Sequence, residues 1–466
     1  MNILQAFADR VAAHPERIAI VDGKGRATTY AQLDARGAAL AARWHAQGLR
    51  EGDRVLLALP LNAGLYAALA ALWRIGAAAV LPEPALGLFG LRHAVAATRP
   101  KALLASGLYR LLPLLGDIRA IPLRLSMHEG EGSHPVGDFA LDTPALISFT
   151  SGSSGAPKAI VRSHAFLAAQ DRAVAPLIAT HGKPETDLVA FPVFVVANLG
   201  QGITSVLPNW PVRRPARAKG AAIRAHAERH GVTRLLLSPA IAETLADHLP
   251  RDAHSLFTGG GPVFPDLIAT LLAAKPGLRV VAVYGSTEAE PIAEIDADAI
   301  ADADWQAMRE GAGLLAGHPA GVRVRIEADE IQVAGDHVVQ GYLDSAHDAS
   351  TKVRDGDGTV WHRTGDGGCF DEQGRLWLRG RVSARIGAHW PFEVEAPARF
   401  WPGVRRAALG RGRDGPVLAI EGDARHLAEW RAAARLPVVH LPRIPVDRRH
   451  GSKVDQAALE AMLGKR

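Results

Sequence analysis

The residues best suited to chemistry form a glycine- and hydroxyl-rich segment that ends in a lysine, Thr150-Ser151-Gly152-Ser153-Ser154-Gly155-Ala156-Pro157-Lys158. It directly follows the apolar residues 147–149, which are typical of a buried strand. Glycines let a backbone approach a ligand closely, while hydroxyls, N–H groups and a lysine suit phosphate oxygens. The spacing is not that of a Walker A loop, because Ala156-Pro157 separates Gly155 from Lys158. We therefore predict a phosphate-contacting loop, with a flexible surface loop as the alternative.

Two more segments place glycines and polar groups at the ends of predicted strands. They read Thr258-Gly259-Gly260-Gly261-Pro262 and Tyr284-Gly285-Ser286-Thr287-Glu288. An aromatic face, a hydroxyl and a carboxylate at a strand end are able to contact a base, a phosphate and a metal together. Taken alone, Tyr284 reads as a core tyrosine and Glu288 as a solvated acid.

The last quarter of the chain adds three polar segments. They read Trp361-His362-Arg363-Thr364-Gly365-Asp366, then Gly380-Arg381, then Gly451-Ser452-Lys453-Val454-Asp455. Between the first two, residues 371–374 are interpreted as a hairpin turn. A single lysine near a C-terminus is ordinarily solvated, so Lys453 gains interest only in the company of the other motifs.

In this order, the five motifs resemble those of the adenylate-forming superfamily, which includes acyl-CoA synthetases, nonribosomal-peptide adenylation domains and luciferases. The resemblance implies an α/β, multi-domain fold, in which a large N-terminal domain of parallel α/β sheets with a β-rich subdomain precedes a small α+β lid. It places the boundary between residues 1–381 and 382–466. Lys158 and Lys453 would then lie on different domains, so that closure of the lid completes the site.

The resemblance also implies a role for each motif. Residues 259–261 lie along the adenine, on which Tyr284 stacks beside Gly285. Thr287 contacts the α-phosphate, and Glu288 is catalytic and holds Mg²⁺. Asp366 binds the ribose hydroxyls, Arg381 reaches the ribose or a phosphate, and Lys453 is the catalytic lysine. Residues 150–155 and Lys158 hold the β- and γ-phosphates.

The implied activity is the AMP-forming activation of a carboxylic acid. The acid attacks the α-phosphorus of ATP, pyrophosphate leaves, and an acyl-adenylate results. Two anions must meet, so cationic side chains and Mg²⁺ are needed to neutralise charge. The acyl group then passes to the thiol of CoA or of a phosphopantetheine on a carrier protein.

Three segments depart from the common pattern of the superfamily. The lid hinge reads Val382-Ser383-Ala384-Arg385 instead of carrying an Asp pair, and residues 387–390 lack the usual lysine. The acyl-pocket segment lacks the usual histidine, and its candidate pocket residues are Phe191, Val193, Phe194 and Asn198. Its apolar character favours an aliphatic or aromatic acid over an amino acid.

A subgroup match accounts for these departures. The segments 284–291, 361–363 and 445–453 resemble the olefin-biosynthesis β-lactone synthetases and the fatty-acid–CoA ligases grouped with them. In the β-lactone enzymes, the β-hydroxyl of the substrate attacks the acyl-adenylate and no thiol is required. Three hypotheses therefore stand, in this order: a thiol-transferring acid ligase, a β-lactone synthetase, and a nucleotide-binding relative without turnover.

The elements that must position these motifs alternate between strands and helices. A helix is expected over residues 28–48, with a threonine cap, and another over 62–75. Short apolar runs predict strands at 54–59, 77–81, 101–105, 187–191, 234–237 and 278–284. This rhythm indicates a mainly parallel sheet covered by helices, and from about residue 321 it changes to short strands and turns.

Composition excludes several classes of function. The 466 residues carry a formal net charge of +5, which is too dilute to indicate nucleic-acid binding. A single cysteine, Cys369, excludes an internal disulfide and an iron–sulfur cluster. The first residues do not resemble a signal peptide, and no apolar run is long enough to span a bilayer. We expect a cytoplasmic enzyme whose partners are a small carboxylic acid and CoA or an acyl carrier protein.

Overall fold

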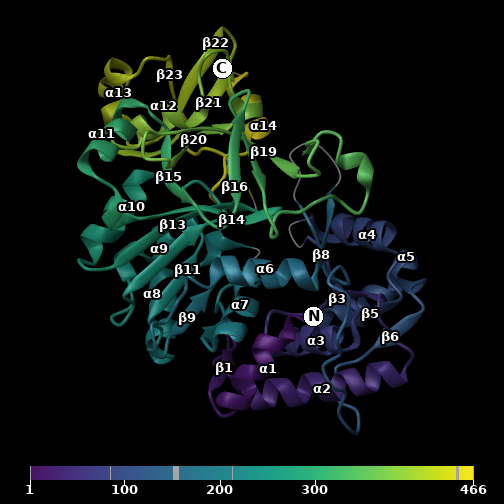
Figure 1. The fold of residues 1–466 in the computed structure, drawn as a ribbon. Coiled ribbons are helices and arrows are strands. Elements are labelled where there is room, and N and C mark those ends of the chain that lie inside the picture. The colour runs from purple at the N-terminus through teal and green to yellow at the C-terminus, as the bar shows by residue number, and fades with distance from the viewer. Residues whose placement is uncertain (1, 84–85, 151–156, 213, 448–450, 465–466) are drawn as a thin grey trace. The chain divides into compact units, whose positions relative to one another are not determined.

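The computed structural model describes residues 2–83, 86–150, 157–212, 214–447 and 451–464, which form two compact units (Figure 1). The first unit comprises residues 1–213, 225–235 and 336–352, and the second comprises 214–224, 236–335 and 353–466. The boundary expected at residue 381 separates a mobile lid from the rest of the chain, which differs from a division into compact units, and it stays a prediction. Within the described ranges, no helix combines the length and the apolar character that crossing a bilayer requires.

A six-stranded sheet forms one part of the first unit, in the order β6-β5-β3-β4-β7-β8. Its first five strands are parallel, and β8 is antiparallel to β7. The strands are β3 (Arg54–Ala58), β4 (Ala78–Leu81), β5 (Ala102–Ala105), β6 (Leu123–Leu125), β7 (Pro144–Phe149) and β8 (Ala159–Ser163). The parallel α/β arrangement expected from the sequence is confirmed.

Local signals begin the helices of this part. Thr29 caps α2 (Tyr30–Ala46), because its hydroxyl accepts from the N–H of Gln32 while the Gln32 amide oxygen accepts from the N–H of Thr29. The Asn62 side chain caps α3 (Ala63–Ile75) by accepting the N–H of Gly64. The helices predicted over 28–48 and 62–75 are therefore confirmed, with ends shifted by one or two residues.

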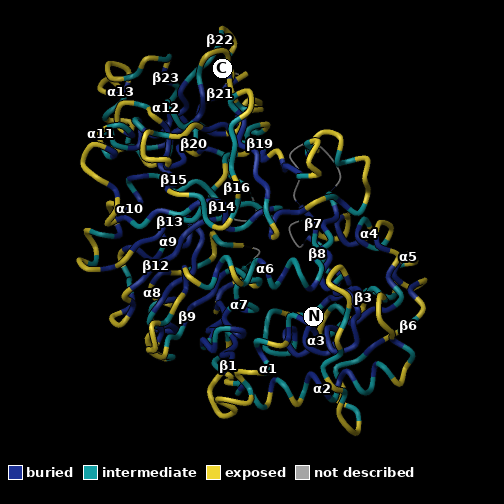
Figure 2. The backbone as a smooth tube through the Cα atoms, in the orientation of Figure 1, coloured by how far each residue is buried: buried dark blue, intermediate teal, exposed yellow. Residues whose placement is uncertain are grey.

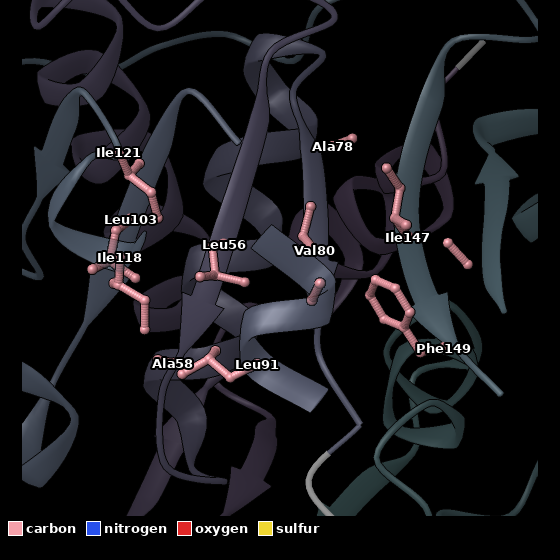
Figure 3. Close-up of a cluster of buried hydrophobic side chains, with 12 residues drawn as sticks. Leu56, Ala58, Ala78, Val80, Leu91, Leu103, Ile118, Ile121, Ile147 and Phe149 are labelled. Atoms are coloured by element: carbon pink, nitrogen blue, oxygen red, sulfur yellow. The ribbon is translucent and has the colours of Figure 1, made fainter. Parts of the chain in front are cut away.

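The core of this part lies on one face of the sheet. Figure 3 shows the strand residues Leu56, Val80, Leu103 and Ile147 pointing into a buried cluster. The face is covered by α4 (Gly87–Thr98), the 3₁₀ helix η2 (Gly107–Leu114) and α5 (Gly116–Arg119), which lie near one another (Figure 1).

A second group of strands in the first unit runs in the order β2-β1-β10-β9. Strands β1, β10 and β9 are parallel, whereas β2 is antiparallel to β1. These strands are β1 (Ile18–Val21), β2 (Ala27–Thr29), β9 (Thr186–Val189) and β10 (Thr204–Val206). The helices α1 (Leu4–Ala13), α6 (His164–Val174) and α7 (Phe194–Gln201) belong to the same unit, while α8 (Gly220–Arg229) and β11 (Arg234–Leu237) cross between the units.

The second unit contains strands in the order β12-β13-β14-β15-β20-β19-β17-β16, of which β12 and β13 are parallel and the later pairs antiparallel. They are β12 (Ser255–Gly259), β13 (Arg279–Ser286), β14 (Ala289–Asp296), β15 (Leu314–Pro319), β16 (Arg323–Glu327), β17 (Glu330–Ala334), β19 (Val360–Phe370) and β20 (Leu376–Arg381). The helices are α9 (Pro239–Leu245), α10 (Pro265–Ala274) and α11 (Asp302–Glu310), and β18 (Lys352–Arg354) precedes β19. The change to short strands and turns near residue 321 is confirmed, and residues 371–374 form the expected turn.

Residues 382–466 contain a small sheet of their own, in the order β21-β22-β23. Its strands are β21 (Val404–Gly412), β22 (Gly415–Gly422) and β23 (Val438–His440), and its helices are α12 (Pro391–Ala398), α13 (Leu427–Ala433) and α14 (Gln456–Leu463). One apolar cluster gathers around Trp430 and another around Leu441 and Leu459. This is the α+β composition expected of the lid.

A buried carboxyl on α12 makes the stability of this region depend on pH. Glu395 is 5% exposed and accepts the N–H of Leu409 at 2.9 Å, and burial raises the pKa of its carboxyl to about 7. Because the folded state holds this proton more tightly than the unfolded state, the stabilisation is present at acidic pH and is lost as pH rises toward 7. Between pH 5 and pH 7.5, wild type should lose about 2 kcal/mol more unfolding free energy than Glu395→Gln. Urea unfolding of both proteins at the two pH values measures this difference, and parallel pH profiles would contradict it.

Candidate active site

In the second unit, two glycine-rich turns follow the carboxyl ends of the neighbouring parallel strands β12 and β13. β12 ends at Gly259, which pairs with Val283 of β13. A Cβ on Gly259 would lie 2.5 Å from the Val283 carbonyl oxygen, and Gly260 has φ +75°, so side chains are excluded at both positions. The structure thereby brings the predicted segments 259–261 and 284–288 to one edge of the sheet, where open α/β sheets bind ligands.

Tyr284, Asp366 and Arg381 form a polar cluster at this edge. The Tyr284 hydroxyl donates to Asp366 Oδ2 at 2.9 Å, and burial followed by the Asp366 charge raises the pKa of the tyrosine. Asp366 of β19 is the cross-strand partner of Arg381 of β20, whose Nη1 lies 3.4 Å from Asp366 Oδ1 and donates to the carbonyl of Thr364 at 2.7 Å. A carboxylate that accepts a hydrogen bond from one hydroxyl has further acceptor sites, which suit hydrogen bonds from the hydroxyls of a ribose.

The turn between β13 and β14 adds a second acid. Thr287 and Glu288 occupy this turn, and the N–H of Glu288 donates to Ser286 Oγ at 3.2 Å. The charge of Asp366, and to a smaller extent that of Glu288, raises the pKa of Arg381. Among the described residues, no three His, Cys, Asp or Glu side chains gather as a metal cage. Glu288 supplies one carboxylate, the kind of protein ligand that Mg²⁺ takes together with substrate phosphate oxygens.

Lys453 sits on a hairpin held by one carboxylate. Asp447 Oδ1 accepts the N–H groups of Ser452 and Lys453 at 3.1 and 2.9 Å, and the N–H of Asp447 donates to the Lys453 carbonyl at 2.8 Å. The Ser452 hydroxyl accepts the N–H of Ala240 at 3.2 Å, at the start of α9. A Cβ on Gly261 would lie 2.7 Å from Ser452 Cβ and 3.9 Å from Lys453 Cγ. The structure thus brings the predicted catalytic lysine beside the predicted adenine segment.

Ion pairs within the second unit fix this arrangement, and the sequence did not predict them. Arg399 of α12 is 5% exposed in its side chain and donates from Nε to Asp266 Oδ1 at 2.9 Å, at the start of α10. Arg406 of β21 lies 3.3 Å from Glu243 of α9. These pairs link the lid region to the helices that follow β11 and β12. The sequence does not indicate which of its opposite charges pair, because the partners of each pair lie more than 130 positions apart.

The predicted phosphate loop lies in the first unit, where Ser151, Gly152, Ser153, Ser154 and Gly155 fall outside the described residues. The N–H of Thr150 donates to the carbonyl of Lys158 at 3.0 Å, which closes the base of the loop. His93 of α4 places Nε2 2.7 Å from the Pro157 carbonyl oxygen, and Lys158 Nζ lies 5.2 Å from the Tyr342 ring centroid. Neither His93 nor Tyr342 was predicted, because both are far from the loop in sequence.

An apolar cavity of about 110 Å³ lies in the first unit between α1, α3, α6 and α7. Of the candidate pocket residues, Val193 and Phe194 are among the residues that line this cavity, and Phe191 and Asn198 are not. Asn198 instead donates from Nδ2 to Asp187 Oδ2 and Ser205 Oγ, both at 3.1 Å, and is fully buried. Asp171 also lines the cavity, and burial raises the pKa of its carboxyl.

Comparison with known proteins finds a family model and relatives that match most of the chain. The family model described as "AMP-binding enzyme" matches residues 7–343. An olefin beta-lactone synthetase of Xanthomonas campestris pv. campestris is 31% identical over 542 residues, covering 98% of this chain and 96% of the relative. A feruloyl-CoA synthase of an Amycolatopsis species is 31% identical, over 86% of this chain and 83% of the relative.

A solved structure shares the fold at lower identity. The o-succinylbenzoate coenzyme A synthetase of Bacillus subtilis, in complex with ATP and a magnesium ion, has a TM-score of 0.76 and 22% identity. The match covers 98% of this chain and 98% of that structure.

Proposed function

The chain belongs to the AMP-binding enzyme family, and from this premise we propose which of its residues carry the reaction. It is an AMP-forming acid ligase, which activates a carboxylic acid with ATP as an acyl-adenylate and releases pyrophosphate. The observation that carries the proposal is the cluster of Tyr284, Asp366 and Arg381, in the unit that also holds Glu288 and Lys453.

In this proposal, Asp366 anchors the ribose and Tyr284 presents its ring to the adenine beside Gly260. The Tyr284–Asp366 hydrogen bond supports it, because it holds the ring and the carboxylate on the same edge of the sheet. Thr287 contacts the α-phosphate from the adjoining turn. Arg381 lies beside the Asp366 carboxylate and orients it, which a ribose anchor requires.

Charge neutralisation falls to three groups. Glu288 would hold Mg²⁺ together with phosphate oxygens, and that ion supplies positive charge to the phosphates. Lys158 of the first unit supplies charge to the β- and γ-phosphates. Lys453 binds the incoming carboxylate and the α-phosphate oxygens, and its amine stabilises the charge that develops as they react. The magnesium-bound synthetase of the same fold supports this choice of ion.

We propose that the apolar part of the acid occupies the cavity lined by Val193 and Phe194. Leucine at Ala197, which also lines the cavity, would fill the volume of two to three methylenes. The kcat/KM for the longest accepted acid should then fall about tenfold, while short acids are unaffected. Pyrophosphate release across a chain-length series measures this. Ala168→Leu, on α6 but outside the lining, is the matched control, and an unchanged length profile for Ala197→Leu would contradict the assignment.

Two acceptors compete in the second step. In thiol transfer, the sulfur of CoA or of a carrier phosphopantetheine attacks the acyl carbon and AMP leaves. In cyclisation, the β-hydroxyl oxygen of the same substrate attacks that carbon, the hydroxyl proton is lost to solvent, and AMP leaves with formation of a β-lactone. Thiol transfer is the first candidate, and the 31% identity to a β-lactone synthetase over 98% of this chain favours the second.

The hinge region provides a structural observation that favours cyclisation. Trp390 is 1% exposed, and the guanidinium groups of Arg379 and Arg385 each lie 4.8 Å from its ring centroid. Both arginines also pair with Asp329 at 3.2 Å. Rotation about residues 382–384 would separate Arg379 from Trp390 and Arg385 from Asp329, because the hinge lies between the members of each of these two pairs. Cyclisation within one substrate requires no such rotation.

One experiment separates the acceptors. The enzyme is incubated with ATP, Mg²⁺ and a panel of apolar acids that includes β-hydroxy acids, with and without CoA or a pantetheinylated carrier protein. Thiol-dependent AMP release with a thioester product supports ligation. A thiol-independent product that is lighter than the β-hydroxy acid by one water supports the lactone. If no acid in the panel releases pyrophosphate, the proposed substrate class is wrong.

A further inference from the structure

The 3₁₀ helix η2 is apolar on two opposite faces. A 3₁₀ helix has three residues per turn, so side chains three positions apart lie on the same face. Tyr109, Leu112 and Leu115 follow this spacing and pack against the buried cluster of Figure 3. Leu108, Leu111 and Leu114 follow the same spacing one position earlier and are 87%, 62% and 80% exposed. The inner face therefore packs against the core, whereas the side chains of the outer face are exposed.

The neighbouring helix α4 extends this exposed surface. Its first turn presents Leu88 and Phe89, which are 44% and 63% exposed. Figure 2 shows exposed positions on α4 and beside α5, and α5 contacts both α4 and η2 in the first unit. We call Leu88, Phe89, Leu108, Leu111 and Leu114, together with Arg110 and Arg119, the leucine–arginine patch. Soluble monomers seldom expose five large apolar side chains together unless the surface binds something.

Basic residues outnumber acidic ones in the segment that carries this surface, with Arg92 paired to Asp117 and Lys101 to Asp53. From the start of α4 to the end of β6, residues 87–125 contain six basic side chains and one acidic side chain, a net charge of 6 − 1 = +5. The whole chain has a net charge of 53 − 48 = +5, so the remaining residues sum to zero. Arg110 and Arg119 are both exposed, on η2 and α5. The six basic residues are Arg92, Arg99, Lys101, Arg110, Arg119 and Arg124.

We propose that the leucine–arginine patch docks the enzyme on an anionic lipid surface. Exposed leucines and a phenylalanine enter the boundary between headgroups and acyl chains, while arginines beside them pair with lipid phosphates. A second copy of the chain is a poor occupant, because a two-fold contact would bring two patches of the same positive charge face to face. The patch also lies near the base of the predicted phosphate loop, since Phe89 stacks on His93 at a centroid distance of 6.5 Å and His93 contacts Pro157.

The test is co-sedimentation of the full chain with phosphatidylcholine vesicles and with vesicles that also contain phosphatidylglycerol, at about 0.15 M salt. Wild type should bind the anionic vesicles at least about tenfold more strongly than the neutral ones. The triple variant Leu108→Ser/Leu111→Ser/Leu114→Ser and the charge variant Arg110→Glu/Arg119→Glu should each lose at least about tenfold in binding to the anionic vesicles. Leu141→Ser is the matched control, because Leu141 is 58% exposed in the same unit but outside the patch, and its binding should not change.

Folding and catalysis are measured beside binding. Both patch variants should keep the wild-type thermal midpoint and acid-dependent pyrophosphate release in the absence of vesicles, since the outer face of η2 contacts neither the core nor the motifs. The proposal is overturned if wild type ignores anionic vesicles, or if the patch variants bind them as wild type does. It is also overturned if sedimentation velocity shows self-association that the leucine variant abolishes while lipid binding persists, because the occupant would then be a second copy.

Discussion

Lys453→Ala should slow acyl-adenylate formation about 10³-fold and leave the affinity for ATP within about threefold of wild type. In the proposed mechanism, the amine acts on charge that develops in the transition state, whereas Asp366, Tyr284 and the phosphate loop hold the nucleotide. Pyrophosphate release measures the first effect, and calorimetric titration with MgATP measures the second.

Two further variants make this result specific. Arg443→Ala removes an exposed cation ten positions earlier in the same region and should leave both quantities unchanged. Asp447→Ala keeps the amine but removes the acceptor of the Ser452 and Lys453 N–H groups, so its rate should fall between those of wild type and Lys453→Ala. Wild-type pyrophosphate release by Lys453→Ala would remove this lysine from the mechanism.

Arg234→Met should destabilise the protein by about 3–5 kcal/mol, the largest stability effect that we expect of a single charged residue here. Arg234 of β11 donates from Nε and Nη2 to the two carboxylate oxygens of Asp187, at 2.7 and 2.9 Å. Asp187 is 0% exposed, and burial raises its pKa even beside the arginine. Removing the arginine leaves a buried acid without its main counterion, and urea unfolding measures the cost.

An exposed pair is the matched control for this prediction. Arg279 Nε lies 2.6 Å from Asp296, at least as close as the buried pair, but the two side chains are 48% and 28% exposed. Arg279→Met should therefore cost no more than about 1 kcal/mol. The double variant Asp187→Asn/Arg234→Met should recover part of the loss, because it removes the buried charge as well. Equal costs for Arg234→Met and Arg279→Met would show that burial does not set the energy.

Local sequence signals predicted the fold well. The Thr29 cap and the apolar run 234–237 describe their elements almost residue for residue, because capping and strand burial depend on neighbours in the chain. The order of five short motifs identified the family, which the match over residues 7–343 confirms. The individual roles of Tyr284, Asp366 and Lys453, and the lid boundary at residue 381, stay predictions.

Contacts between residues that are distant in sequence could not be predicted. Tyr284 meets Asp366 across 82 positions and Ala240 meets Ser452 across 212, and only the packing of the sheet brings each pair together. Asn198 shows the same limit. It lies in the apolar pocket segment, but its side chain donates a hydrogen bond to Asp187. The exposure of the leucines of η2 could not be predicted either, because a spacing of three does not tell which of two apolar faces is covered.

The crowding at Gly259 and Gly261 has a consequence for engineering. Neither position has room for a methyl group, since one would meet the Val283 carbonyl and the other Ser452. A mutagenesis library aimed at new substrates should therefore keep both glycines invariant. Diversity belongs at Ala6, Ala70 and Ala197, whose side chains border the cavity from three helices. Substrate specificity could then be varied at the cavity residues without changing the residues of the proposed nucleotide site.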